Sequence, residues 1–325
     1  MAKKIEISSK TIIFTAFFLL GLVLVWQIKD LIFSLFIAFI IAGALKPAVD
    51  YLEKRRIPRS LAAFLIYFFF IFLIVNLLGL VIPPLVKEMT HLIKNLPHII
   101  QKAFPTAADY FDLTIISQNL PNLANRAVDI IRSLFSNVIF LTTTLFFGFY
   151  LLLEKNFIGD VLPNFFDESE AKKINLLVER AQKRTAAWFW GEIILMTIVG
   201  TMTYVGLTLI GMKYTVALAV LAGFLEVVPT LGPIISTVPA ALIGFSTSSV
   251  LGFSNIALYF IVQQLENNLI VPLVMRRIVG LHPIVTLTAL IIGGKLAGIL
   301  GVLLAVPMTI FLQTILIERQ ELQKG

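Results

Sequence analysis

Residues 226–239 read Glu-Val-Val-Pro-Thr-Leu-Gly-Pro-Ile-Ile-Ser-Thr-Val-Pro, which places one carboxylate and three prolines inside an otherwise apolar region. A helix cannot easily continue through such a run, because proline donates no backbone hydrogen bond and clashes with the preceding turn. We therefore predict a helix break over residues 229–233 at membrane depth, where protein or a water-filled cavity must surround it. The alternative is an interfacial loop with Glu226 reaching toward the headgroups. The residues expected to form this break or a gate are Pro229, Gly232 and Pro233.

The composition around this stretch defines the class of protein. Of the 325 residues, 58% are hydrophobic and 14% are charged, and the mean hydropathy is +0.93. Several apolar runs reach the roughly 20 residues that a helix needs to cross a hydrocarbon core, and they do not alternate as the strands of a β-barrel do. The sequence therefore predicts an all-α, polytopic integral membrane protein with about eight transmembrane helices. The candidate spans are 11–28, 31–46, 60–86, 137–153, 191–211, 214–228, 234–249 and 254–275, followed by a broken apolar region over 284–316.

The pattern of apolar and polar runs divides the chain into four parts. Residues 1–86 hold the first three spans, and 87–136 are too polar to span but have helical periodicity, which predicts an amphipathic extracytoplasmic subdomain. Residues 137–190 hold the fourth span and an amphipathic helix, which lies either on an anionic membrane surface or against the other spans. Residues 191–325 form the predicted transport core, with re-entrant or broken helical hairpins. Whether 231–249 and 284–305 cross the membrane fully or re-enter stays open.

Charge indicates orientation and excludes several functions. The net charge is +7, and short loops carry much of it, which places both termini of this multi-pass protein in the cytoplasm. The basic residues after the second span are Lys46, Lys54, Arg55, Arg56 and Arg59. We expect contact with membrane lipid but no nucleic-acid partner, because no basic stripe with interleaved aromatics is present. The chain has no cysteine, and it has no metalloprotease, nucleophile-elbow or phosphate-loop motif, so we expect no catalytic residues, no metal and no cofactor.

A second polar cluster lies inside the predicted span 254–275. An ionisable group in a membrane helix faces a cavity or a partner and is a functional candidate by default, whereas Gln and Asn also serve simply to hold helices together. Helical geometry puts Gln263, Glu266 and Asn267 on one face. Pro272 leaves the carbonyl of residue 268 without its helical donor, beside this cluster. The candidate solute- or ion-binding residues here are Gln263, Gln264, Glu266, Asn267 and Asn268.

The third region, residues 280–307, has two apolar arms of about ten residues, each too short to span, which predicts a re-entrant hairpin. Its turn is expected at Gly293-Gly294-Lys295. Lys295 is either a tip or pore residue or an anchor that reaches the membrane surface. Gly293 and Gly294 let backbones approach closely, and Pro283 begins the first arm, so these three are predicted gating positions.

These motifs resemble those of the autoinducer-2 exporter family of bacterial permeases. The resemblance rests on Glu226-Val-Val-Pro-Thr-Leu-Gly-Pro-Ile, Gln263-Gln-Leu-Glu-Asn-Asn-Leu-Ile-Val-Pro272, Gly280-Leu-His-Pro283 and the glycine-rich run from Gly293 to Pro307. It implies a multi-span inner-membrane homo-oligomer that exports small polar solutes, autoinducer-2 being the named example, and some relatives are regarded as sodium or lithium/proton antiporters. The positions to which it assigns function are Glu226, Pro229, Gly232, Pro233, Gln263, Glu266, Asn267, Pro272 and Pro283.

The sequence thus predicts an exporter of a small polar solute, with H⁺ or Na⁺ as candidate coupling ions. Glu266, Asn267 and Gln263 are expected to contact the solute or ion, and Glu226 to accept a proton or act in gating. One alternative is a monovalent cation/proton antiporter on the same scaffold. Another is a membrane scaffold that transports nothing. The prediction for Glu226 requires that residues 226–239 lie close to Gln263 and Glu266.

Overall fold

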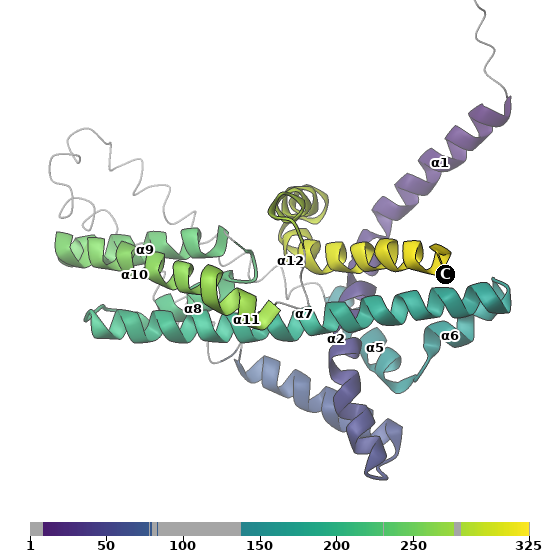
Figure 1. The fold of residues 1–325 in the computed structure, drawn as a ribbon, viewed down its shortest axis with the longest axis horizontal. Coiled ribbons are helices and arrows are strands. Elements are labelled where there is room, and N and C mark those ends of the chain that lie inside the picture. Colours follow the sequence, from purple (N-terminus) through teal and green to yellow (C-terminus); the bar gives the residue numbers. More distant parts are fainter. Residues whose placement is uncertain are drawn as a thin grey trace, which may run out of the picture.

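The computed structural model describes residues 9–77, 79, 83, 138–229, 231–275 and 281–324, and the predicted subdomain of 87–136 lies outside them. The described residues form helices and no strand, which confirms the all-α fold class. In chain order the principal elements are α1 (Ser9–Gln27), α2 (Lys29–Lys54), a helix over Arg59–Leu77, α5 (Val138–Leu153), α6 (Phe157–Val161), α7 (Glu168–Leu209), α8 (Thr215–Leu225), α9 (Leu231–Thr247), α10 (Ser249–Leu265), a π-helical turn η2 (Glu266–Ile270), α11 (Val271–Met275) and α12 (Pro283–Lys324) (Figure 1).

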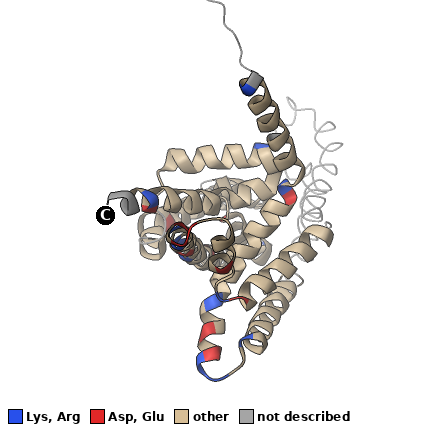
Figure 2. Cartoon of the chain, turned by 90° about the vertical axis from the view of Figure 1, so that its right-hand side faces the viewer, with Lys and Arg blue, Asp and Glu red and all other residues tan. Residues whose placement is uncertain are grey.

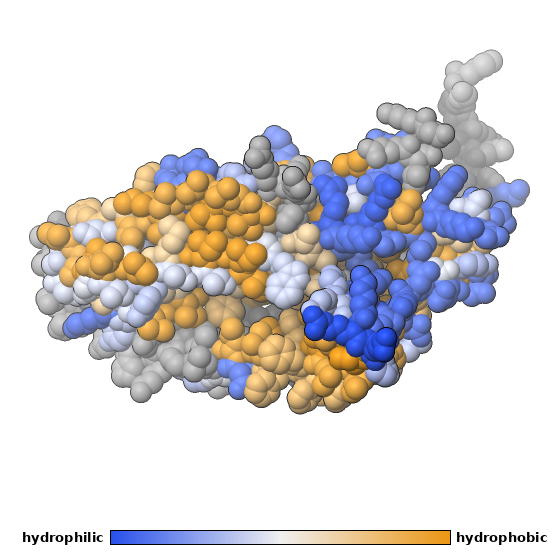
Figure 3. Space-filling view, turned by 60° about the horizontal axis from the view of Figure 1, so that its bottom comes forward, coloured by the Kyte–Doolittle hydropathy of each residue, from blue (hydrophilic) through white to orange (hydrophobic). Residues whose placement is uncertain are grey.

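Five of the described helices are long and apolar enough to cross a membrane, or six if the bent pair α5 and α6 with its following turn counts as one span. Helices α8 and α9 are also apolar but are shorter than these candidate spans. The predicted count of eight stays a prediction. In Figure 3 the hydrophobic surface extends over the end of the molecule that α9 and α10 form, and hydrophilic residues gather at the opposite end, where α7 begins. The fold is that of a polytopic membrane protein.

The turn after α2 is tied to the end of α5 by one arginine. Arg59 donates from Nε to the carbonyl of Leu153 at 2.8 Å and from Nη2 to that of Leu152 at 2.9 Å. Its Nη1 also pairs with Asp50 at 2.8 Å and Glu53 at 3.0 Å. Next to Arg59, helix α2, the Arg59–Leu77 helix and α5 share a core that includes Val49, Ala62 and Leu152. Figure 2 shows charged residues gathered at this turn, whereas α8, α9 and α10 contain none.

We expect Arg59→Lys to lower the stability of the folded protein by about 2 kcal/mol, because one ammonium cannot reproduce the planar fork that serves two carbonyls and two carboxylates. Thermal unfolding in detergent would measure the loss. Arg55→Lys is the matched control, since Arg55 lies on the same turn, is exposed and, within the part of the chain that the structure describes, its side chain contacts the hydroxyl and ring of Tyr51. Equal unfolding temperatures for the two variants would show that the fork does not stabilise the turn.

The long helix α7 joins two segments that the sequence analysis treated separately, the amphipathic helix before residue 190 and the span after it. Its first half packs on other helices. Gln182 donates to the carbonyl of Phe39 at 3.2 Å and Trp190 to that of Ala44 at 3.1 Å, so α2 crosses α7 here. The side chain of Gln182 lies directly over Gly43, where a larger residue would have no room. The segment before residue 190 therefore packs against α2.

The second half of α7 forms a bundle with α8, α9 and α10 (Figure 1). Gly200 of α7 and Gly223 of α8 bring the two backbones together, because a Cβ on Gly200 would lie 3.3 Å from the carbonyl oxygen of Ala219 and 3.6 Å from the Cα of Gly223. Ser248 caps α10 by accepting a hydrogen bond from the backbone of Leu251 at 3.1 Å, as serine does at helix starts. The core of the bundle consists of Leu207, Met212, Leu218, Ala222, Ala240, Ile243 and Tyr259.

The last helix is a hairpin rather than a rod. Ala297 and Gly298 have non-helical backbone angles inside α12, and Gly298 has φ +59° and ψ −133°, a combination open essentially to glycine alone. Gly293 and Gly301 face each other across this turn, each against the other's carbonyl. The predicted hairpin is therefore present, but its turn lies at 297–298 and not at 293–295, because the close glycine pair belongs to the arms and the turn needs the positive φ.

Candidate functional site

The predicted helix break is present and very tight, but it lies between Leu225 and Leu231 and not over 229–233, because α9 already includes Gly232 and Pro233. Helix α8 ends at Leu225, Glu226 is its C-cap, and α9 begins at Leu231, with Pro233 in its first turn. Gly232 makes the turn possible, since its Cα approaches the carbonyl of Leu225 so closely that a Cβ would collide with it. The turn therefore fixes the position of Glu226, whose side chain points into the protein and is only 2% exposed.

The second predicted break, near Pro272, also has a structural counterpart. Helix α10 widens into the π-helical turn η2, which starts at Glu266 and ends two residues before Pro272. A proline cannot donate to the helical ladder, and single π-turns often mark functional sites. Glu266 is buried here and accepts a long hydrogen bond of 3.4 Å from Nε2 of Gln263.

These two breaks bring their glutamates together. The carboxyl groups of Glu226 and Glu266 lie close enough to interact directly, and Glu192 of α7 interacts electrostatically with both. We call Glu192, Glu226 and Glu266 the acidic centre. The three residues come from α7, from the turn between α8 and α9, and from η2, and each is at most 5% exposed. The sequence-based condition that residues 226–239 lie close to Glu266 is therefore met.

The charge state of the acidic centre is constrained by its surroundings. None of the ion pairs among the described residues includes these three carboxylates. Two like unit charges about 4 Å apart repel by about 4 kcal/mol even at an effective dielectric constant near 20. A carboxyl group can also hydrogen-bond to a carboxylate only if one of the two carries a proton. The Glu226 and Glu266 pair therefore holds a proton when it is not bound to something else.

One oxygen of the pair is available for a further ligand. Oε2 of Glu226 is fully buried and has no hydrogen-bond partner among the described residues. Such an atom costs free energy unless a proton, water or solute satisfies it. Within the part of the chain that the structure describes, no group of three or more His, Asp or Glu side chains is placed to hold a metal ion. A proton, a hydrogen-bond donor or a monovalent cation would each satisfy this oxygen.

Several predicted site residues lie elsewhere. Asn267 was expected on the face of Gln263 and Glu266, but the buried face of α10 and η2 follows Tyr259, Val262, Glu266 and Ile270, and Asn267 lies beside that line and is exposed. Gln264 and Asn268 are exposed too, and the amide of Asn268 donates to the carbonyl of Gln264 at 2.9 Å. The remaining positions away from the centre are Lys295, exposed two residues before the turn of α12, and Pro283, exposed at its start.

Glu192 was missed by the sequence analysis. It is the second residue of the predicted span 191–211, where a charged group is normally an interfacial residue. In the structure α7 extends unbroken through that boundary, so Glu192 lies in the middle of a helix and is buried. The available signal was a lone carboxylate following the aromatic run Trp188-Phe-Trp190, on a helical stripe with Leu195 and Val199.

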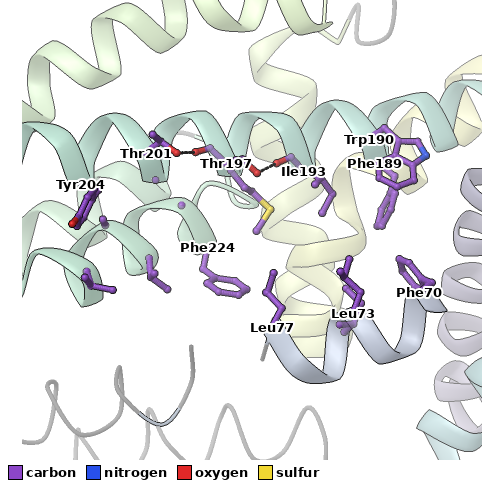
Figure 4. A pocket seen from close by; sticks show the side chains of 17 residues that line it. Phe70, Leu73, Leu77, Phe189, Trp190, Ile193, Thr197, Thr201, Tyr204 and Phe224 are labelled. Carbon is purple, nitrogen blue, oxygen red and sulfur yellow. Dashed lines mark hydrogen bonds between the residues drawn. The ribbon is translucent and has the colours of Figure 1, made fainter. Parts of the chain in front are cut away.

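Two apolar cavities lie beside the acidic centre. The first, of about 630 Å³, is enclosed by the Arg59–Leu77 helix, α7 and α8; Figure 4 shows Phe70, Leu73 and Leu77 facing Ile193, Thr197 and Phe224. The second, of about 830 Å³, lies toward α2, α5 and α12, and includes Val227 and Pro307 in its lining. The cavities share a wall made of Phe70, Ile74, Phe189 and Ile193. The carboxylates line neither cavity, so the cavities flank the polar site without being part of it.

Comparisons with known proteins agree with this architecture. The family model of AI-2E family transporters matches residues 12–320. YueF of Bacillus subtilis is 29% identical to the chain over 303 residues, covering 86% of this chain and 82% of YueF. YrrI of the same organism is 26% identical, covering 90% and 87% respectively, and PerM of Escherichia coli K12 is 24% identical, covering 91% and 89%. The first two are named as transport proteins and the third as a permease. Since the family model extends over nearly the whole chain, the protein belongs to the AI-2E family of membrane transporters.

Proposed function

We propose that this permease moves a small polar solute across the membrane and that the acidic centre, together with Gln263, binds it. The observation that supports the proposal is the meeting of two helix breaks and three buried carboxylates at one place. Substrate sites of secondary transporters are typically formed by such discontinuous helices. Carboxylate and carboxamide oxygens accept hydrogen bonds from the hydroxyl groups of a polar solute.

For the identity and direction of the cargo, we propose export of a molecule like autoinducer-2. The family resemblance supports this choice. In the proposed cycle, the proton shared by Glu226 and Glu266 leaves to water, and hydroxyl groups of the solute donate hydrogen bonds to the two carboxylates in its place; when the solute leaves, a proton from water returns. Release of the solute restores the shared proton, which prevents two carboxylates from facing each other uncompensated.

A second candidate function, monovalent cation/proton antiport, is favoured by the same shared proton. A sodium or lithium ion and a proton are alternative ways to neutralise the Glu226 and Glu266 pair. Backbone oxygens freed at the π-helical turn supply further oxygen ligands of the kind that hard cations prefer.

We further propose the bacterial inner membrane as the location, with both termini in the cytoplasm and several copies assembled together. The basic turn around Arg55 and Arg59 supports the orientation. The exposed carboxamides of Gln264, Asn267 and Asn268 support assembly, because amides of this kind hydrogen-bond across helices inside membranes.

Reconstituted vesicles test these functions. We expect purified protein to move labelled autoinducer-2 across the bilayer in the absence of sodium and lithium. Proton movement that starts only when sodium or lithium is added, without solute movement, would instead identify the antiporter. If neither solute nor protons cross faster than in vesicles without protein, the transport proposal is wrong and a scaffold remains. Vesicles carrying an unrelated reconstituted membrane protein serve as the control for leakage.

A further inference from the structure

The polar character of the bundle continues beyond the acidic centre. The buried face of α10 follows Gly252, Asn255, Tyr259 and Val262 and leads directly to Glu266. By helix geometry Tyr259 lies about 10 Å and Asn255 about 16 Å from Glu266 along the helix axis. Asn255, Tyr259 and Glu266 are the polar residues on this buried face. They form a line that begins at the acidic centre.

The facing helix α7 has a matching line. Its buried stripe includes Glu192, Leu195, Val199, Thr203 and Leu207, and Thr203 lies about 16 Å from Glu192 along the axis. Helices α7 and α10 contact each other along this stretch: Gly206 meets the side chain of Leu258, and Leu207 belongs to the same core cluster as Tyr259. Figure 1 shows α7, α9 and α10 running alongside one another here.

Each of these polar side chains has one buried oxygen without a hydrogen-bond partner among the described residues. Thr203 Oγ1, Tyr259 Oη and Asn255 Oδ1 are buried and have no hydrogen-bond partner among the described residues, as is also true of Glu226 Oε2. The exposed fractions of Thr203, Tyr259 and Asn255 are 1%, 5% and 0%. The amide nitrogen of Asn255 donates to the carbonyl of Ala240 at 3.1 Å. This bond fixes the side chain, and the unpaired atom is the amide oxygen Oδ1. Unpaired buried polar atoms in a row are typical of sites where ordered water completes the hydrogen bonding.

Charged groups do not interrupt this line. Between residues 193 and 265 the sequence has only two charged residues, Lys213 and Glu226, and no histidine. Lys213 lies exposed in the connection between α7 and α8, and Glu226 belongs to the acidic centre. The titratable groups that face the inner end of the line are therefore Glu192 from α7, Glu226 from the turn between α8 and α9, and Glu266 from η2. Any proton that moves along the line must be passed by neutral hydroxyl groups and water.

We propose that α7 and α10 enclose a hydrated polar path, formed by Thr203, Tyr259 and Asn255, through which protons reach the acidic centre from the end of the bundle where α9 turns into α10. Each hydroxyl group accepts a proton on its oxygen and passes its own proton to the next water, so no charge accumulates on the path. The amide of Asn255 orients water and carries no proton itself. The proton-carrying role of this path rests on the proposed function. The presence of water in the path does not depend on it.

Radiolytic hydroxyl footprinting of the protein in lipid nanodiscs tests for water in the path without requiring transport. An X-ray pulse produces hydroxyl radicals from water, and a buried ring is oxidised only where water lies beside it. Tyr67 is the matched internal control: it is also 5% exposed, but its hydroxyl donates to the carbonyl of Leu145 at 2.9 Å. We expect Tyr259 to be oxidised several-fold faster than Tyr67. Equal rates for the two tyrosines would overturn the proposal.

Two near-isosteric variants test whether the path carries protons. In vesicles with an internal pH dye, Tyr259→Phe and Thr203→Val are expected to slow transport-linked proton movement several-fold while leaving solute affinity unchanged. Thr208→Val is the control, because Thr208 is exposed on the same helix and its hydroxyl donates to the carbonyl of Tyr204 at 2.7 Å. Unchanged proton movement in both path variants would overturn the proton-carrying role even if the footprint is positive. An inactive wild-type protein would refute the proposed function, and the footprint would still decide whether the path exists.

Discussion

Changing Glu226 and Glu266 together to glutamine is expected to abolish transport while the protein still folds. Glutamine has nearly the same shape as glutamate and keeps a carbonyl oxygen that can accept the hydrogen bond from Gln263. It removes both the charge and the shared proton, which the proposed cycle requires. Because repulsion between buried carboxylates disappears as well, we expect an unfolding temperature equal to or above that of the wild type.

The measurement is uptake or efflux of labelled solute in vesicles, together with thermal unfolding of the same preparation. Glu170→Gln is the matched control, since Glu170 is an exposed carboxylate in the first turn of α7 and lies far along that helix from the acidic centre. Transport that survives in the double variant, with its dependence on pH unchanged, would remove the acidic centre from the mechanism. Loss of transport accompanied by a lower unfolding temperature would instead show that the two glutamates are needed for the stability of the fold.

Gly232→Ala is expected to lower the stability of this protein strongly. The new Cβ would collide with the carbonyl of Leu225, a backbone atom that cannot move aside as a flexible side chain does. Overpacking of this kind typically costs about 1 to 3 kcal/mol, and here it would also force α9 away from the end of α8. Because that turn places Glu226, we expect transport to fall together with stability.

Thermal unfolding in detergent and vesicle transport would both be compared with those of Gly21→Ala. Gly21 also lies inside a helix, but no atom of a neighbouring element lies within 4 Å of a Cβ built there. In that variant alanine's higher helix propensity, worth about 1 kcal/mol, is expected to leave stability unchanged or slightly raised. If Gly232→Ala unfolds at the same temperature as the wild type, the close approach of the two backbones does not constrain the turn.

The sequence predicted most of the helices because membrane spans have a strong and local signal. Long apolar runs predicted both ends of α1 and α5 to within two residues, whereas α2 ends eight residues after its predicted end and α10 begins five residues before its predicted start. Proline and glycine chemistry also predicted the break between α8 and α9 and the one near Pro272. Both signals depend on the local chain alone, so neither required knowledge of which helices pack together.

The features that the sequence did not predict depend on tertiary contacts. Glu192 was missed because the apolar run ends beside it, whereas the helix continues through that boundary and packs against its neighbours. The outward position of Asn267 depends on which stripe of α10 meets α7, and periodicity alone does not choose between adjacent stripes. The turn of α12 was misplaced by a few residues because several glycines compete for it, and only the backbone angles show that Gly298 is the one that turns.

The unbroken length of α7 connects the charged end of the protein with the bundle. A helix of 42 residues behaves as a stiff rod, and α2 holds it at two points, Gln182 and Trp190. On one side of this crossing Arg180 pairs with Glu318 of α12. On the other side Glu192 lies only about 3 Å along the axis from Trp190, whereas Leu207 lies about 26 Å from it, so a tilt of about 10° about the crossing would move Leu207 by about 4 Å and Glu192 hardly at all. The crossing of α2 and α7 therefore holds a buried carboxylate in place while a tilt moves the far end of the same helix.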